Sequence, residues 1–96
     1  MKPSEALQAH RAELRQLASR HGVLCPRVFG SVVHNEDRDG SDLDLLVDPT
    51  PSTTLLTLAA IQLEAEQLLG VPVDVLTPNS LPRHGRERIL REAIAV

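Results

Sequence analysis

Two carboxylates placed two positions apart, Asp42 and Asp44, are the residues of this sequence best suited to chemistry. They stand in the run 42–47, which is rich in branched apolar residues and is bounded by Gly40 and Pro49, as expected of a strand. Side chains alternate across a strand, so both carboxylates face one side while Leu43 faces a core. Two adjacent carboxylates repel each other unless a cation lies between them. Mg²⁺, which prefers carboxylate, water and phosphate oxygens, is the cation that this pair predicts.

A third acid, Asp74, lies in another apolar run, residues 71–76. Val73 and Val75 would face one side of this second strand and Asp74 the other. Because neighbouring strands lie about 4.8 Å apart, pairing of the two strands would bring Asp74 to the acid pair. Three acids there would hold two Mg²⁺ ions, about 3.5–4 Å apart in the usual arrangement, and Asp74 is a candidate to help deprotonate an attacking hydroxyl.

The dipeptide Gly30-Ser31 precedes Asp42 by a ten-residue interval that ends in Ser41. It follows a strand expected over residues 23–29, and glycine there would let the backbone approach a ligand closely. We expect a short helix over 31–37, whose first N–H groups and serine hydroxyl hold triphosphate oxygens. Arg38 is a candidate charge-assisted donor to the same phosphates, and Ser41 completes the candidate nucleotide-binding set.

Composition narrows the function further. The 96 residues, 42% of them hydrophobic, predict one globular domain over 1–96 with a modest core. A net charge of −3 and a single aromatic residue, Phe29, argue against a general nucleic-acid binder, which presents many cations and stacking rings. The lone Cys25 allows no internal disulfide, and no apolar run approaches the ~20 residues of a membrane span, so we expect a cytoplasmic protein. Cys25 itself is expected to be a small core residue.

Helices are expected to flank the strands. Ser4 is a candidate cap for a helix running to Arg20, and a second helix is expected over 53–69. The second helix is apolar over a broad arc, so we expect it to be buried; the alternative is that part of its surface awaits a partner. The stretch 34–40, which contains Asp37, is expected to be a solvated loop. The fold class predicted is α/β (α+β), a small mixed sheet of three to four strands flanked by helices.

A last helix is expected to end near residue 95, with arginines along one side: Arg83, Arg86, Arg88 and Arg91. They are either a solvated surface balanced by glutamates or a contact for an acidic partner or nucleotide phosphate.

The segments around Gly30-Ser31 and residues 38–47 together resemble the minimal nucleotidyltransferases of the DNA polymerase beta superfamily. That family's pattern is Gly-Ser, ten residues, Asp-x-Asp, and a later acid on a strand. The resemblance spans about residues 5–94 and implies the polymerase-beta-like nucleotidyltransferase fold. It implies that Asp42, Asp44 and Asp74 are the catalytic, metal-binding acids. Many relatives carry Ala-Arg-Gly after the Gly-Ser, where this sequence has residues 32–34 as Val-Val-His.

The resemblance also implies an activity. Stand-alone members of similar length act as antitoxins that add AMP from ATP to a tyrosine of a HEPN-domain ribonuclease toxin. A chain this short has no room for an acceptor-binding domain, so we expect the acceptor to be another protein or bound by one, with the two chains forming a complex. The alternative is a non-catalytic antitoxin that neutralises its partner by binding alone. Transfer to a small molecule such as an antibiotic is the least favoured reading.

Overall fold

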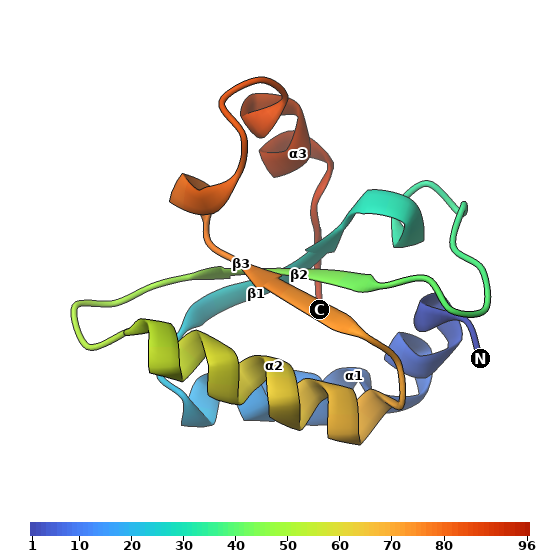
Figure 1. Ribbon diagram of the computed structural model, residues 1–96, viewed down its shortest axis with the longest axis horizontal. Helices are drawn as coiled ribbons and strands as arrows, with labels where there is room; N and C mark the ends of the chain where they lie inside the picture. The colour runs from blue at the N-terminus through green and yellow to red at the C-terminus, as the bar shows by residue number, and fades with distance from the viewer.

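The computed structural model describes residues 1–96, and its centre is a four-stranded sheet in the order β3-β2-β1-β4. Strands β1 (Leu24–Phe29) and β2 (Leu43–Asp48) are antiparallel. Strand β3 (Val73–Leu76) runs parallel to β2, and β4 (Ile94–Ala95) is antiparallel to β1. Helices lie on both sides of the sheet (Figure 1). The mixed α/β architecture predicted from the sequence is therefore confirmed.

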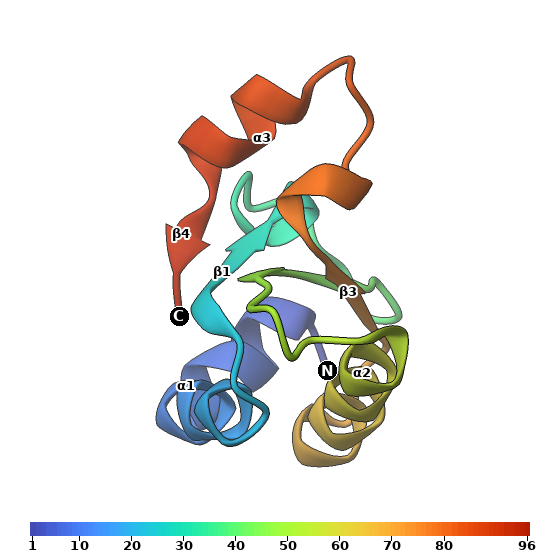
Figure 2. The ribbon, with the colours of Figure 1, turned by 90° about the vertical axis from the view of Figure 1, so that its left-hand side faces the viewer.

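Helices α1 (Pro3–Arg20) and α2 (Leu55–Leu69) pack side by side on one face of the sheet (Figure 2). The side chains between helices and sheet form the main core, to which β2 contributes every second residue: Leu43, Leu45 and Val47. The alternation predicted for this strand is thus observed, and the intervening side chains point to the opposite face. None of the helices combines the length and the apolar character that a membrane crossing requires.

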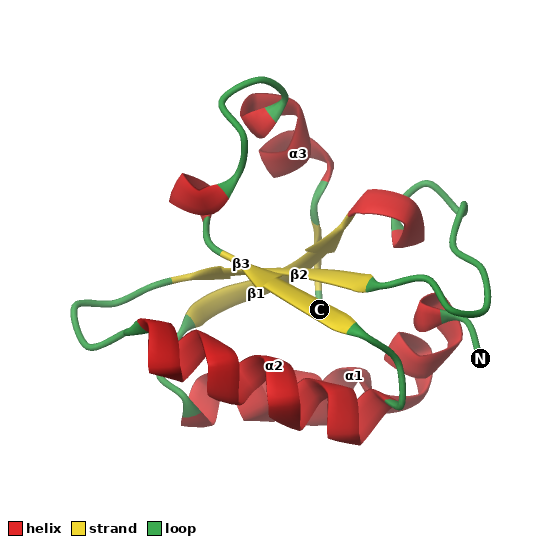
Figure 3. Cartoon of the chain, in the orientation of Figure 1, coloured by secondary structure: helices red, strands yellow, loops and turns green.

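The opposite face of the sheet carries the C-terminal segment, shown above the sheet in Figure 3. This segment consists of a 3₁₀ turn (Pro78–Ser80), helix α3 (Arg86–Glu92) and β4. A second, smaller cluster holds it to the sheet, with Phe29, Leu46 and Leu81 at its centre and Ile89 packed against them. This face of the sheet is therefore covered by the C-terminal segment and, beside Asp44, by the turn that begins at Gly30.

Two of the expected helices are shorter than the sequence suggested. Helix α3 ends at Glu92 instead of near residue 95, and the chain enters β4, where Val96 donates its N–H to the Pro26 carbonyl at 3.0 Å. The otherwise unpaired edge of β1 supplies hydrogen-bond partners for the backbone of residues 94–96. These hydrogen bonds take the place of those that one more turn of α3 would form. The helix expected over 31–37 is a single 3₁₀ turn, η1 (Gly30–Val32), and the left-handed Asn35 (φ +55°) prevents its continuation.

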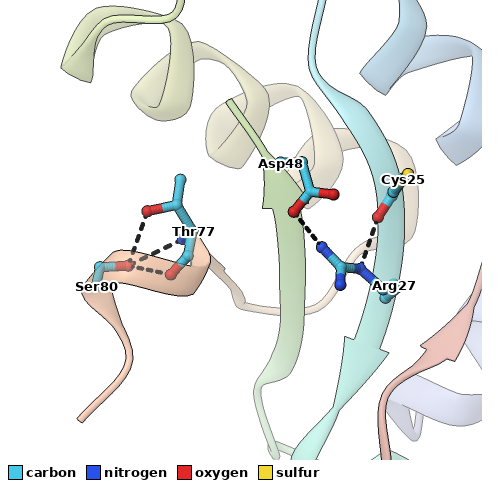
Figure 4. A network of polar contacts seen from close by, with 5 residues as sticks. All are labelled: Cys25, Arg27, Asp48, Thr77 and Ser80. Carbon is cyan, nitrogen blue, oxygen red and sulfur yellow. Dashed lines mark hydrogen bonds and ion pairs between the residues drawn. The ribbon is translucent and has the colours of Figure 1, made fainter. Parts of the chain in front are cut away.

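Strand β1 is irregular near its start. The register with β2 shifts between Leu24 and Arg27, and Cys25 has φ +50° and is exposed, so the expected core position for Cys25 is wrong. Pro26 lies in this bulge-like irregularity, where a missing N–H breaks no ladder bond. The Arg27 side chain braces it by donating to the Cys25 carbonyl and to Asp48 on β2 (Figure 4).

Three further expectations, about the Ser4 cap, the loop containing Asp37 and the burial of α2, are also wrong. The N-cap of α1 is Lys2, and the N–H of Ser4 is bound by the Asp37 carboxylate at 2.8 Å. Asp37 is therefore buried, only 7% exposed, and not part of a solvated loop. On α2, Leu55 and Leu56 are 85% and 82% exposed, so this helix is not wholly buried.

Candidate active site

The three predicted acids lie on the face of the sheet opposite α1 and α2. Asp44 on β2 and Asp74 on β3 occupy paired positions in the parallel register, so their side chains lie next to each other on adjacent strands. Asp42 directly precedes β2, which begins one residue later than expected. The structure therefore brings together acids from two strands that are separated in sequence by the whole of α2.

Electrostatics show how closely the three carboxylates interact. Partial burial, then the charge of Asp74, then that of Asp42 raise the pKa of Asp44 to about 6 from the ordinary 3.8. The ion pairs of the chain all involve other residues, so none of the three carboxylates has a cationic side chain within 4.0 Å. A site of this kind favours a bound cation over three ionised acids alone.

Gly30 is required by the geometry of the acid site itself. The residue before it, Phe29, is the register partner of Asp44, and a Cβ at Gly30 would lie 2.3 Å from Asp44 Oδ2. Gly30 also has φ +79°, a conformation that other residues rarely adopt. The turn and the carboxylate can therefore be adjacent only with glycine here, which is a steric reason beyond the ligand approach expected from the sequence.

The other predicted nucleotide-binding residues differ in their placement. Ser31 follows Gly30 in η1, and its carbonyl accepts a bond from the Glu36 N–H while its hydroxyl remains free. Ser41 Oγ accepts the Arg38 N–H at 2.9 Å, and the Ser41 N–H donates to the Arg38 carbonyl at 3.0 Å. Ser41 therefore closes a turn before the acid pair, while the exposed Arg38 side chain is not fixed toward the site. Their contacts with nucleotide stay predictions.

The acids suit a hard divalent cation by chemistry rather than by preformed geometry. No three His, Cys, Asp or Glu side chains gather in metal-ligating positions. Asp42 and Asp74 are exposed and Asp44 is half-buried, so their oxygens remain accessible to an ion and its waters. Carboxylate donors with no internal counter-charge match what Mg²⁺ binds, usually together with phosphate oxygens of a substrate. The fit to Mg²⁺ is therefore one of donor type and charge.

A pocket that sequence reasoning did not find adjoins this site. It has a volume of about 360 Å³ and lies between the Gly30-Ser31 turn and α3, with Arg88 in its lining. His34 Nε2 lies 3.2 Å from Glu92 Oε1, both of which line the pocket, and so links the loop after η1 to α3. The partners are 58 positions apart, so no local pattern could have revealed the contact.

Comparison with known proteins identifies the family. Residues 7–96 match the family model described as the nucleotidyltransferase domain. The chain is 39% identical to the protein adenylyltransferase MntA of Thermococcus cleftensis over 90 residues, which are 94% of this chain and 88% of the relative. It is 43% identical over 77 residues to a Methanocaldococcus jannaschii protein provisionally named a protein adenylyltransferase, covering 80% of this chain and 83% of that one.

Solved structures agree with this result. One described provisionally as a minimal nucleotidyltransferase superposes with a TM-score of 0.86 at 46% identity and covers 97% of this chain and 95% of its own. A toxin-antitoxin structure with AMP-PNP has a TM-score of 0.74 at 14% identity, covers 88% of this chain and 69% of its own, and thus shares the fold. Because the family model matches residues 7–96, and Asp44 and Asp74 lie on adjacent strands beside the Gly-Ser turn, this protein belongs to the nucleotidyltransferase family and is an enzyme of that class.

Proposed function

We propose that this chain transfers AMP from ATP to a tyrosine hydroxyl of a partner protein, a HEPN-type ribonuclease toxin, and thereby acts as its antitoxin. The observation that carries the proposal is the placement of Asp44 and Asp74 at paired positions on adjacent strands, with Gly30 against Asp44 and Asp42 directly before β2. Relatives named protein adenylyltransferase support a protein acceptor. The fold shared with a toxin-antitoxin structure supports the kind of partner.

The proposed reaction is substitution at the α-phosphorus of ATP. The hydroxyl oxygen forms a bond to this phosphorus, the bond to the bridging oxygen of the β-phosphate breaks, and pyrophosphate leaves. Mg²⁺ held by the three acids would supply neutralisation of charge on the phosphates and on the attacking and leaving oxygens. The free Ser31 hydroxyl and neighbouring backbone N–H groups bind phosphate oxygens and keep the reacting atoms aligned.

Asp74 is the best candidate to accept the proton of the attacking hydroxyl. It lies on β3, one of the two edge strands of the sheet, and is more exposed than Asp44. An acceptor side chain from a second protein can reach it from solvent. Asp44, pressed against Gly30, is suited to hold the cation instead. An Asp74→Asn variant with normal turnover would remove Asp74 from the proton-accepting role.

The function is tested by incubating the chain with its partner, ATP and Mg²⁺ and measuring the intact mass of the partner. We expect a gain of one AMP, abolished by Asp42→Ala combined with Asp44→Ala. The matched control is Glu13→Ala combined with Glu87→Ala, which removes two exposed carboxylates, one on α1 and one on α3. An unmodified partner in the presence of well-folded wild-type chain would contradict the proposal.

A second function, neutralisation by binding alone, is favoured by one observation. Leu55, Leu56 and Leu63 of α2 are between 57% and 85% exposed, which is a large exposed apolar surface for one helix. If binding alone neutralises the partner, the double alanine variant of the acids still protects, whereas Leu55→Ser with Leu56→Ser does not. Leu24→Ser, at an exposed leucine on β1, is the control for a general loss of surface hydrophobicity.

A further inference from the structure

The pocket between η1 and α3 lies next to the acid site, because Gly30 both lines the pocket and lies against Asp44. Its wall on the sheet side includes Phe29 and Gly30, the residues that pair with and contact Asp44. Ser31, with its free hydroxyl, lines the same wall. A phosphate chain whose α-phosphorus lay at the acids and which passed the Gly-Ser turn would reach this pocket.

Arg88 is the cation on the far wall of the pocket. Two other arginines of α3 are already engaged: Arg86 donates to the Leu81 carbonyl at 2.7 Å, and Arg91 lies 3.7 Å from Glu87. Arg88 makes no hydrogen bond or ion pair within the chain, and it lines the pocket. Its guanidinium is thus free to bind a ligand.

Two glutamates also line the pocket, and only one of them has a hydrogen-bonding partner. Glu92 Oε1 lies 3.2 Å from His34 Nε2, a hydrogen-bonding contact that also joins α3 to the loop after η1. Glu36 is exposed and its carboxylate has no partner, so it is the one free negative side chain in the lining. An anionic ligand is therefore attracted by Arg88 and opposed by Glu36, and each effect can be tested separately.

We propose that Arg88 binds the γ-phosphate of the nucleoside triphosphate, so that α3 forms the wall that selects a triphosphate over a diphosphate. A guanidinium offers paired N–H donors that match phosphate oxygens, and such charge-assisted bonds are among the strong ones. The inference rests on the proposed function in one respect: a nucleoside triphosphate must occupy the acid site. It does not depend on which molecule accepts the nucleotide.

The test is calorimetric titration of the full chain, with Mg²⁺ present, using α,β-methylene-ATP and α,β-methylene-ADP. Nucleotidyl transfer cannot break the α–β bond of these probes, and they differ only in the γ-phosphate. We expect the wild-type chain to bind the triphosphate probe more tightly. Arg88→Gln should weaken triphosphate binding by roughly ten- to a hundredfold and leave diphosphate binding unchanged, as expected for loss of a charged hydrogen bond.

Matched variants separate this role from a general effect. Arg91→Gln, also on α3 but outside the pocket, should bind both probes like the wild type, and Arg88→Lys should retain part of the preference. Glu36→Gln should tighten triphosphate binding. An Arg88→Gln variant that weakens both probes equally, or neither, would overturn the inference. A chain that keeps its Arg88-dependent preference yet transfers no AMP to the partner would support it while refuting the proposed function.

Discussion

Asp44 should destabilise the folded protein at neutral pH, because burial and two neighbouring carboxylates make its ionisation unfavourable. The pKa of Asp44 rises from 3.8 to about 6. At about 1.4 kcal/mol per pKa unit, ionising a carboxyl with this shift would cost about 3 kcal/mol of stability if solvent did not screen its charge. Solvent screens a half-exposed carboxylate, so we halve this to about 1.5 kcal/mol. Asp44→Asn keeps the shape of the side chain and removes the charge. It should stabilise the chain by about that amount at pH 8.

The dependence on pH has a definite sign. Between pH 3.8 and about 6 the folded chain holds a proton on Asp44 that the unfolded chain has released. The wild type therefore loses stability as the pH rises through 6, and the advantage of Asp44→Asn is full above that pH. Below 3.8 the carboxyl is protonated in both states, so the advantage disappears.

Urea unfolding at pH 4 and pH 8, with EDTA present to remove divalent ions, measures this difference. Glu87→Gln is the control, since it neutralises an exposed acid on α3 and should change the free energy of unfolding little at either pH. An Asp44→Asn variant that is no more stable than the wild type at pH 8 would refute the electrostatic reasoning. An equal gain at both pH values would also refute it.

Three further outcomes are expected. Gly30→Ala should abolish AMP transfer and lower the free energy of unfolding, because the added Cβ would lie 2.3 Å from a carboxylate oxygen of Asp44. Gly40→Ala, at a similar φ but in open space, should keep AMP transfer. Equal AMP transfer by the two variants would contradict the steric role of Gly30. The hydrogen bond from the first turn of α1 holds the pKa of Asp37 below its usual range. Asp37→Asn replaces a charged acceptor by a neutral one and should cost about 1 kcal/mol at pH 7. This cost should disappear as acid protonates the wild-type carboxyl, as urea unfolding against pH would show. Mg²⁺ should raise the melting temperature of the wild type but not of the Asp42→Ala, Asp44→Ala variant, because binding to the folded state alone stabilises it; an equal rise would exclude the acids as ligands.

The acid pair could be predicted because strand alternation is a local property. Asp42 and Asp44 share a face in any strand, and Leu43 and Leu45 identify the buried side. The apolar run around Asp74 indicated a second strand, and a parallel strand joined to the first through a helix is expected to lie beside it. The paired positions of Asp44 and Asp74 confirm that reasoning.

What could not be predicted depends on contacts between distant segments. The helical spacing of Ile89, Leu90 and Ala93 favours continuation to residue 95, but the free edge of β1 binds the end of the chain instead. Asp37 looked like a loop acid because its partner, the first turn of α1, lies 33 residues away. The pocket beside Arg88 likewise forms only when α3 returns to the Gly-Ser turn.

The most direct test of the central claim is a crystal structure grown with Mn²⁺ and α,β-methylene-ATP, in which anomalous scattering locates the metal. We expect anomalous peaks bounded by carboxylate oxygens of Asp42, Asp44 and Asp74, with the phosphates passing the Gly30-Ser31 turn. Bound nucleotide without a metal between these three side chains would contradict the account.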